Sequence, residues 1–296
     1  MRIFLTGPTG HVGGAVLDAL LRAGHSVTGL VRDQPRARKL KKRGVEAVVG
    51  DLGDSRWRDA AIGFDALIHT ALDSQRGAEA DGKAVETLIS AAQSTGGQPR
   101  LVYTSGVWVL GTTPAPADEG AALSPAAHSA WRAAHEKQVL SATGLTPVVV
   151  RAGIVYGGTR GIVGDLLRDA VNGLIRIIGD GRNRWATIYD RDLADLYVRL
   201  VTAPDVAGTY HATDEADESV LDIVEALSRN TTHKPDVRLM PIEEARAKLG
   251  AYADALAMDQ VVRSPRARAL GWTPSLRSIG GNAPRLLEEW RNGQMD

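Results

Sequence analysis

Three glycines near the start of the chain have the spacing of a phosphate-binding turn. Gly7, Gly10 and Gly13 stand three residues apart in "TGPTGHVGG". They follow the apolar segment 2–6 and precede an amphipathic segment at 13–23. In a strand–turn–helix unit such glycines permit a tight turn, let the backbone approach a pyrophosphate, and let the helix pack closely on its strand. Because the first N–H groups of the helix would face the phosphates, the pattern predicts a nucleotide site.

The end of the second predicted strand indicates which dinucleotide the chain prefers. An acidic residue about 20 positions after the glycines usually binds the ribose 2′-hydroxyl of NAD, whereas an arginine accommodates the 2′-phosphate of NADP. The chain has Arg32 at this place, and the basic run 36–44 follows, either as added positive charge or as a solvated helix face. A shift of one residue would instead make Asp33 the acid typical of NAD. We expect NADP(H), with NAD(H) as the alternative.

Short apolar segments alternate with helical ones through the first half of the chain. The predicted strands lie at 2–6, 26–31, 46–50, 65–70, 100–105 and 146–151. The predicted helices lie at 13–23, closed by Gly24, at 55–61, with Ser55 as N-cap, at 77–94 and at 128–142. Strands that are apolar throughout and joined by helices are typical of a parallel sheet buried on both faces. We therefore expect an α/β protein with a doubly wound parallel Rossmann sheet.

After Arg151 the pattern changes to glycine-rich turns and further helices. The later helices are predicted at 190–202, 219–228, 242–249 and 279–290. This change indicates a dinucleotide-binding domain at 1–155 and a smaller C-terminal substrate lobe at 156–185 and 213–296. We expect the segment 186–212 to pack back on the first domain.

Composition argues against several classes of protein. The chain has 296 residues, and its 35 basic side chains balance 35 acidic ones, so no net charge favours nucleic acid or an anionic membrane. It has no cysteine, hence no disulfide or thiolate nucleophile, and its seven histidines lack the spacing of a metal site. No apolar run approaches the roughly eighteen residues of a membrane span. We expect a cytoplasmic protein that binds no metal, membrane or nucleic acid.

A series of further motifs follows the glycine turn in a fixed order. They are "GDL", "IHTA", "LVYTSGVWVLG", "VVVRAGIVYGG", "IGDGRNRWATIYDRDLADLY" and "SPRARALGWTP". Together with "TGPTGHVG" they span nearly the whole chain, which resembles the extended, or atypical, branch of the short-chain dehydrogenase/reductase superfamily. The resemblance implies a Rossmann fold, a nicotinamide cofactor, a small-molecule substrate and a homodimer. It implies little about which substrate is used.

The chain departs from this family at its catalytic positions. In the family a serine or threonine polarises the substrate, a tyrosine transfers the proton, and a lysine four residues later holds the nicotinamide ribose. The matching positions carry Gly106, His128 and Arg132. No tyrosine lies between 104 and 155 that could take the place of His128. Arg132 can still bind ribose hydroxyls, but an arginine does not release its proton.

Other side chains could supply the missing catalytic groups. His128 is one proton donor, and Tyr156 in "VYGG" is the best replacement acid, with a structural role as the alternative. Ser105 carries a hydroxyl but points to the other face of a regular strand. Thr104 shares the face of Gly106 but lies roughly 7 Å back along the strand. We assign His128, Arg132, Tyr156 and Ser105 as candidate catalytic residues.

The remaining candidates surround the cofactor and the substrate. Asp51 ends the third strand, either as an acceptor for the adenine amino group or as a turn residue. Besides the glycines and Arg32, we expect cofactor contacts from Thr9, His11, Val12, Asp51, Leu52, Thr70, Ala71, Thr104 and Arg132. The expected substrate residues are the aromatic Trp108, Trp185 and Tyr189, with Arg160, Arg182 and Arg184 as candidates for holding an anionic group. Ordinary packing and surface exposure are the alternatives for both sets.

These features predict an NADPH-dependent oxidoreductase that transfers hydride to a small organic substrate. Because strong acid assistance is missing, an iminium or a conjugated C=C bond is favoured over a carbonyl, although His128, Tyr156 or water could still protonate a ketone. Two alternatives stay open. One is a sugar-type epimerase or dehydratase that is non-redox or internally redox, and the other is an NADP(H)-sensing regulatory protein without turnover.

Overall fold

The computed structural model describes residues 1–294, which divide into two compact units. The first unit contains Met1–Ser105, Trp131–Arg151 and Leu193–Tyr210. The second contains Gly106–Ala130, Ala152–Asp192 and the chain from His211 onward. The segment 106–130 thus belongs to the second unit, although it precedes the boundary that we expected at 155.

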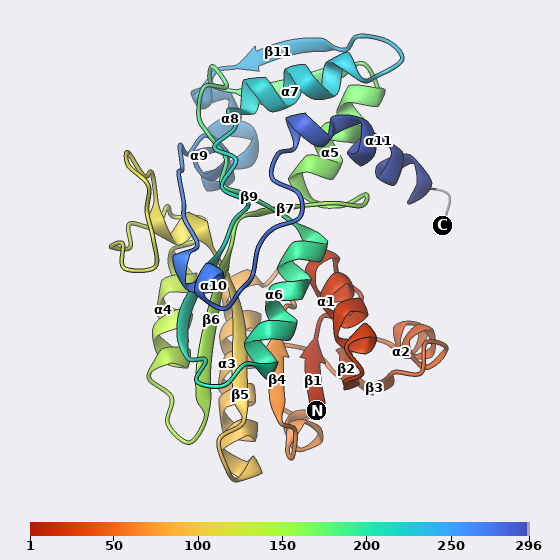
Figure 1. Ribbon diagram of the computed structural model, residues 1–296, viewed down its shortest axis with the longest axis vertical. Helices are drawn as coiled ribbons and strands as arrows, with labels where there is room; N and C mark the ends of the chain where they lie inside the picture. The colour runs from red at the N-terminus through yellow and green to blue at the C-terminus, as the bar shows by residue number, and fades with distance from the viewer. Residues whose placement is uncertain (295–296) are drawn as a thin grey trace. The chain divides into compact units, whose positions relative to one another are not determined.

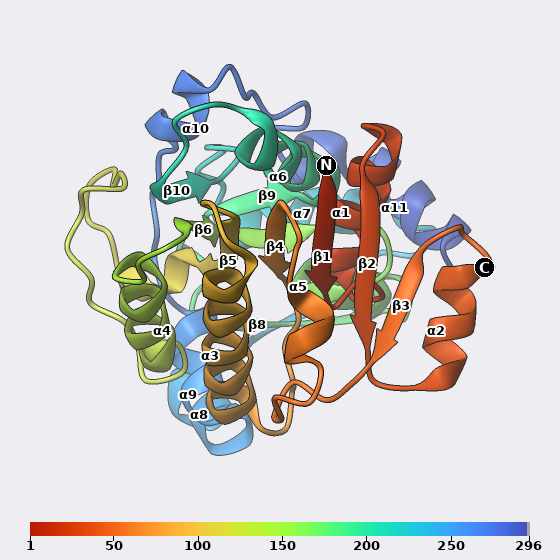
Figure 2. The ribbon, with the colours of Figure 1, turned by 90° about the horizontal axis from the view of Figure 1, so that it is seen from below.

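A seven-stranded sheet with the order β10-β6-β5-β4-β1-β2-β3 forms the centre of the fold (Figures 1 and 2). The strands are β1 (Arg2–Thr6), β2 (Ser26–Val31), β3 (Glu46–Val49), β4 (Ala66–His69), β5 (Arg100–Gly106), β6 (Thr146–Ala152) and β10 (Gly208–Ala212). β1 pairs in parallel with both β2 and β4, so the strand order reverses between β1 and β4. The predicted doubly wound α/β class is confirmed. In such sheets, ligands bind at the carboxyl ends of the strands where the order reverses.

Helices cover both faces of this sheet (Figure 2). α1 (His11–Arg22) and α6 (Asp190–Thr202) lie on one face, and α3 (Gly77–Thr95) and α4 (Ala130–Leu140) lie on the other. Burial explains the apolar strands, since side chains on both faces are removed from water. The core on the α3 side includes Phe4, Leu67, Leu88, Tyr103 and Val139.

Two segments that we predicted as single α-helices form 3₁₀-helix over part or all of their helical length. The segment 55–61 forms only the short 3₁₀-helix η1 (Arg58–Ala61), and Trp57, rather than Ser55, stands at its start. The Trp57 ring is buried and stacks on Phe4, with ring centroids 5.8 Å apart. The segment 279–290 is also divided, into the 3₁₀-helix η3 (Gly280–Asn282) and α11 (Ala283–Asn292).

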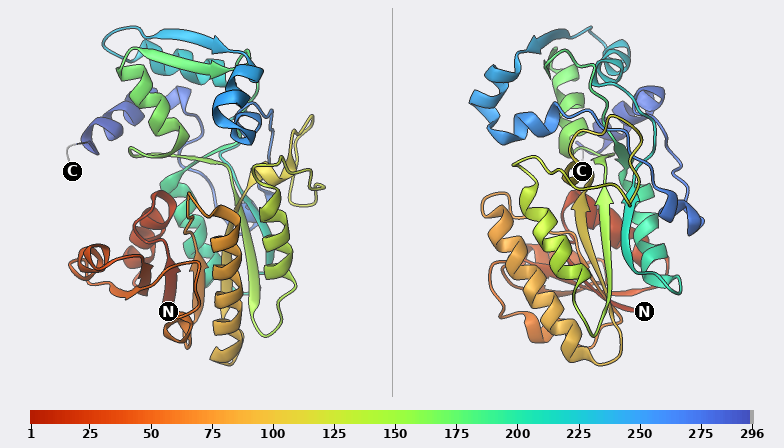
Figure 3. Two further views of the ribbon diagram at one scale, coloured as in Figure 1. Left: turned by 180° about the vertical axis from the view of Figure 1, so that it is seen from behind. Right: turned by 90° about the vertical axis from the view of Figure 1, so that its left-hand side faces the viewer.

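The second unit has two small parallel sheets, each of two strands. β7 (Ile154–Tyr156) pairs with β9 (Thr187–Tyr189), and β8 (Leu174–Ile178) pairs with β11 (Asp236–Met240). Figure 3 shows β8 and β11 side by side. The helices of this unit are η2 (Val107–Leu110), α5 (Gly161–Val171), α7 (Val220–Arg229), α8 (Ile242–Leu249), α9 (Ala251–Leu256), α10 (Pro265–Ala269), η3 and α11.

Membrane-spanning helices and groups of metal ligands are both missing from the described part of the chain. No helix within residues 1–294 has both the length and the apolar character needed to cross a membrane. Nor do three or more potential metal ligands gather among these residues.

Candidate active site

The glycine turn joins β1 to α1 at the carboxyl end of β1. Gly7 has a φ of 73°, and a Cβ atom there would lie 2.8 Å from Cα of Ala71. A Cβ atom on Gly13 would lie 2.1 Å from the Gly7 carbonyl oxygen and 2.5 Å from Thr70 Oγ1. Because these distances leave no room for a methyl group, both positions require glycine. The close packing brings the start of α1 against the exits of β1 and β4.

The residue before α1 is a glycine and not a residue with a capping side chain. Gly10 is the N-cap in an extended conformation and makes no side-chain capping bond. The first amides of any helix lack acceptors within that helix, so a ligand can take the place of a cap. Thr70 Oγ1 donates to the Thr6 carbonyl oxygen at 2.7 Å, which ties the ends of β1 and β4 together beside this turn. The expected contacts Thr9 and Val12 lie on the same turn.

Arg32 and Asp33 differ in their availability at the end of β2. Asp33 is the N-cap of α2 (Gln34–Lys41), where it accepts from the Arg36 amide at 2.8 Å and pairs with the Arg36 guanidinium. The hydrogen bond from the Arg36 backbone amide, together with the Arg36 charge, lowers the pKa of the Asp33 carboxyl. Arg32 is exposed and makes no hydrogen bond or ion pair with any residue of the described chain. A cation is therefore available at this point, whereas the neighbouring carboxylate already has partners.

Asp51, the candidate adenine acceptor, has a cationic partner. Both of its carboxylate oxygens lie 2.8 Å from one Arg76 nitrogen, and the Gly53 amide donates to Oδ1 at 2.7 Å. The same Arg76 nitrogen donates to Asp73 at 2.8 Å. Leu52 is buried beside this cluster. Sequence reasoning missed Arg76, because no motif marks an arginine that lies 25 residues from its partner.

Arg132 is held against the strand that carries Thr104. Its Nη1 donates to the Thr104 carbonyl oxygen at 2.9 Å, and its guanidinium carbon lies 4.3 Å from the centre of the Trp131 ring. The Thr104 hydroxyl lies 2.5 Å from the hydroxyl of Tyr197, which is fully buried. The cation that replaces the family lysine is therefore fixed near the carboxyl end of β5.

The sequence pattern of the NAD dependent epimerase/dehydratase family matches residues 3–213. The chain belongs to this family. Its likeness to reductases extends over most of its length. The protein is an oxidoreductase of the extended short-chain dehydrogenase/reductase type that uses a nicotinamide cofactor.

Three comparisons illustrate these likenesses. A 4-hydroxy-2-methyl-3-oxo-4-farnesyl-3,4-dihydroquinoline-1-oxide ketoreductase of Stigmatella aurantiaca is 29% identical, over 83% of this chain and 78% of that protein. A 3-diazoavenalumate denitrifying reductase of a Streptomyces species is 28% identical, over 93% of this chain and 96% of that protein. The human epimerase family protein SDR39U1, solved with NADPH, has the same fold, with a TM-score of 0.81, 22% identity, and coverage of 97% of this chain and 99% of that one.

The helix α4, which we expected to carry the proton donor, begins later than predicted. α4 is Ala130–Leu140, so His128 precedes the helix that we predicted at 128–142. The Ser129 amide donates to the Ala126 carbonyl at 2.9 Å, and the Ser129 hydroxyl donates to the Trp108 carbonyl at 3.2 Å. These bonds hold a turn, as serine commonly does near helix starts.

His128 instead lies within a group of three rings in the second unit, which we call the aromatic trio of Trp108, His128 and Tyr252. The ring centroids are 5.7 Å apart for Trp108 and His128, 5.0 Å for His128 and Tyr252, and 5.9 Å for Trp108 and Tyr252. His128 is exposed, and burial, with the charge of Asp165, raises the pKa of the Tyr252 hydroxyl. Sequence reasoning missed Tyr252, which lies on α9, far from the other two rings along the chain.

Neither Ser105 nor Gly106 offers an accessible hydroxyl at the end of β5, because Ser105 is buried and glycine has no side chain. The Ser105 side chain is buried, and its Oγ makes no hydrogen bond within the described chain. At Gly106 a Cβ atom would lie 3.6 Å from the Ala152 carbonyl oxygen, an ordinary contact. Packing alone therefore does not explain why a glycine stands at the family's serine or threonine position.

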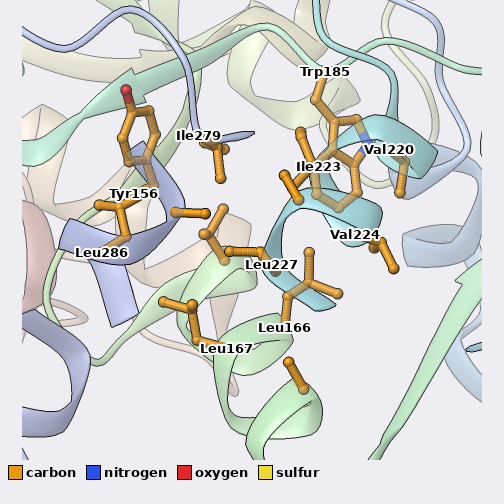
Figure 4. Close-up of a cluster of buried hydrophobic side chains, with 14 of the residues drawn as sticks. Tyr156, Leu166, Leu167, Trp185, Val220, Ile223, Val224, Leu227, Ile279 and Leu286 are labelled. Carbon is orange, nitrogen blue, oxygen red and sulfur yellow. The ribbon is translucent and has the colours of Figure 1, made fainter. Parts of the chain in front are cut away.

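Tyr156 and Trp185 lie in the apolar core of the second unit (Figure 4). Tyr156 is fully buried, and its hydroxyl donates to the Leu276 carbonyl at 3.4 Å. Burial, followed by the nearby charge of Asp214, raises its pKa well above the ordinary value. The Trp185 indole donates to the Leu256 carbonyl at 2.9 Å. These side chains contribute packing, and the structure does not place the Tyr156 hydroxyl where a substrate could reach it.

Tyr189 and the candidate arginines have protein partners or lie on the surface. Tyr189 is also buried, and its hydroxyl donates to Glu289 at 2.9 Å. Burial, with that hydrogen bond, raises its pKa to about 12. Arg184 forms two bonds to Asp259, at 2.9 and 2.7 Å, so its charge is already compensated. Arg160 and Arg182 are exposed.

Proposed function

We propose that the protein is an NADPH-dependent reductase of a small organic substrate. The observation that carries the cofactor preference is the contrast between Arg32, which is exposed and without a hydrogen-bonding partner in the described chain, and Asp33, which is bound to Arg36. A free guanidinium suits a 2′-phosphate, whereas the carboxylate that would bind a 2′-hydroxyl is occupied.

Two further parts of the nucleotide have a matching group in the first unit. The open start of α1 at Gly10 suits the pyrophosphate, and Arg132, fixed on the Thr104 carbonyl, suits the hydroxyls of the nicotinamide ribose. When bound, the nicotinamide supplies the hydride. The protein residues bind and orient the cofactor, and none of them needs to change its redox state.

The substrate is proposed to need little acid assistance. Tyr156 is buried, Gly106 has no hydroxyl, and Ser105 is buried, which leaves exposed His128 as the candidate donor. His128 belongs to the aromatic trio, whose Trp108 and Tyr252 rings suit a planar unsaturated group. Imines and conjugated alkenes combine both requirements. The ketoreductase named above keeps a carbonyl substrate within the proposal.

The cofactor preference is tested by binding. Calorimetry on the unaltered protein should give tighter binding of NADPH than of NADH, and Arg32→Asp should weaken NADPH binding by about tenfold to a hundredfold, because a hydrogen bond to a charged group contributes roughly 1.5–3 kcal/mol. Arg38→Asp is the matched control, since Arg38 is also exposed and lies on α2, the short helix that follows Arg32. Equal affinity of the unaltered protein for both cofactors would refute the preference.

The reaction is tested by single-turnover oxidation of NADPH with a panel of carbonyl, imine and enone compounds. Oxidation with an imine or an enone would support the proposed substrate class. The buried Tyr156 and the missing hydroxyl at Gly106 also favour a second candidate, an NADP(H)-sensing protein without turnover. Tight binding of NADPH with no oxidation across the panel would support this second function instead.

A further inference from the structure

A buried carboxylate lies where α3 meets α4, β4 and β5, and has no part in the function proposed so far. Asp81 on α3 is 2% exposed and accepts hydrogen bonds from three different elements. Tyr103 Oη on β5 donates at 2.8 Å, His135 Nδ1 on α4 at 2.7 Å, and His69 Nε2 at the end of β4 at 3.2 Å. A buried charge is stable only when it is paired or hydrogen-bonded in this way.

The donors fix the protonation of this centre. Burial alone would raise the pKa of Asp81, but hydrogen bonds from His135 and His69, with the charge of Arg132, lower it well below the ordinary value. An ionised carboxylate only accepts, so His69 carries its proton on Nε2. The other ring nitrogen of His69, Nδ1, lies 2.6 Å from the Thr6 hydroxyl at the end of β1.

The contacts of Asp81 and Arg132 close a ring. Tyr103 precedes Thr104, whose carbonyl oxygen accepts a hydrogen bond from the Arg132 guanidinium. His135 follows Arg132 by one turn of α4. Both ends of the Arg132 contact are therefore tied to one carboxylate, through β5 on one side and α4 on the other. Gly82 makes the approach possible, because a Cβ atom there would lie 3.0 Å from His135 Nε2.

We propose that Asp81 is a positioning residue for Arg132 and acts on it through His135 and Tyr103. The proposal rests on the function proposed above, in which Arg132 binds the nicotinamide ribose. Asp81 touches neither cofactor nor substrate in this role. It fixes the α4 turn and the β5 end between which Arg132 is held.

Substitution by asparagine is the sharpest change, because it keeps the shape of Asp81 but not its acceptors. Three N–H or O–H groups point at this side chain, and an amide has one oxygen acceptor and two hydrogens of its own. At least one of the three groups must then turn away, lose its partner or, at His69, change its tautomer. At His135 the matched pair is His135→Asn, whose amide can still donate from the place of Nδ1, and His135→Ala, which cannot.

The first experiment needs no cofactor. NMR relaxation of the Arg132 Nε–H group, assigned with Arg132→Lys, reports how firmly the guanidinium is held. We expect an ordered signal in the unaltered protein and in His135→Asn, and a mobile one in Asp81→Asn and His135→Ala. An Arg132 signal that stays ordered in both Asp81→Asn and His135→Ala would overturn the proposal. Should Asp81→Asn fail to fold, the experiment uses Tyr103→Phe instead, which removes the Tyr103 hydroxyl that donates to Asp81.

The second experiment measures the NADPH dissociation constant in a double-mutant cycle. Asp81→Asn should weaken binding on the order of tenfold, as the loss of a buried hydrogen-bonded group does, and His135→Asn should largely restore what His135→Ala loses. In an Arg132→Ala background Asp81→Asn should change binding by less than about twofold, because its effect passes through Arg132. Full additivity of the two changes would overturn the proposal.

The two experiments separate this inference from the proposed function. If Arg132 becomes mobile in Asp81→Asn but the unaltered protein binds no NADPH, the positioning role stands and the cofactor assignment fails. If NADPH binds and the order of Arg132 does not depend on Asp81, the cofactor assignment stands and the positioning role fails.

Discussion

Arg151 and Glu136 form an ion pair in the interior of the first unit. Arg151 Nη2 lies 2.7 Å from Glu136 Oε2, and Nε lies 3.1 and 3.2 Å from the two carboxylate oxygens. Both side chains are almost fully buried. Because Arg151 lies on β6 and Glu136 directly follows His135 on α4, the pair fastens the Arg132 helix to the sheet.

Removing one partner of this pair should destabilise the fold strongly. Arg151→Met leaves the Glu136 carboxylate buried without its cation, and the free energy of unfolding should fall by about 3–5 kcal/mol in urea titrations. The double change Arg151→Met with Glu136→Leu replaces the pair by apolar groups and should recover most of the loss. A double variant as unstable as Arg151→Met would contradict this account of the pair.

A side chain should abolish NADPH binding at Gly10 but not at Gly14. Gly10→Val places a branched side chain where backbone must meet the pyrophosphate, so NADPH binding should be lost while the circular dichroism spectrum stays unchanged. Gly14→Ala is the control, because a Cβ atom there has only an ordinary 3.8 Å contact with the Pro8 carbonyl. The control should bind NADPH normally. Full affinity in Gly10→Val would place the phosphate site elsewhere.

Asp214 should make the second unit less stable as the pH rises. Its carboxyl is buried, accepts from Thr187 Oγ1 at 2.8 Å and from the Ala216 amide at 3.1 Å, and has a pKa raised by burial to about 7. Between about pH 4 and 7 the folded protein keeps a proton that the unfolded chain has released, so stability falls with rising pH across this interval.

The matched variant for this effect is Asp214→Asn, which resembles the protonated acid. Near pH 4 the two proteins should unfold alike. At pH 8 the variant should be more stable by roughly 4 kcal/mol, as a pKa difference of this size implies. Chemical denaturation at a series of pH values provides the measurement. A difference in stability that does not change between pH 4 and 8 would show that Asp214 is ionised throughout.

His128 should matter in proportion to the acid assistance that a substrate needs. His128→Ala should lower the single-turnover rate with a ketone by about 10²–10⁴, the usual contribution of a general acid, and should leave NADPH affinity nearly intact. With an iminium or a conjugated alkene the loss should be small. The pH profiles of the unaltered protein and His128→Ala provide the comparison. Overlapping profiles with a ketone would remove His128 as the proton source.

The sheet was predictable because parallel strands that are buried on both faces are apolar along their whole length. β1 and β2 have the predicted bounds, and β5 and β6 differ by one residue at their ends. β10 of this sheet and the four strands of the second unit were not predicted; of these, β7 and β9 have only three residues each. α5 was missed because glycines interrupt its pattern, and Gly164 is required there: a Cβ atom would lie 2.7 Å from the Thr159 carbonyl.

The same contrast holds for the candidate site. The glycine turn is a local motif, and its geometry follows from residues within one strand–turn–helix unit. Asp81 and His135 are 54 residues apart, and an aspartate within a helix reads as a solvated residue when its partners are unknown. Tyr252 carries no signal for a similar reason, because its ring neighbours come from distant segments. The helix start at Ala130 depended on the Ser129 bonds, which no periodicity shows.

The order of the two units along the chain bears on how the protein must be synthesised. The chain passes between the units five times, after residues 105, 130, 151, 192 and 210. β10 is the last strand of the sheet and ends at Ala212, so a nascent chain cannot complete the sheet until this residue has left the ribosome. Until then the buried strand β6 has an unpaired edge, which is a template for aggregation. Recombinant fragments that end soon after Ala152 would retain that edge permanently.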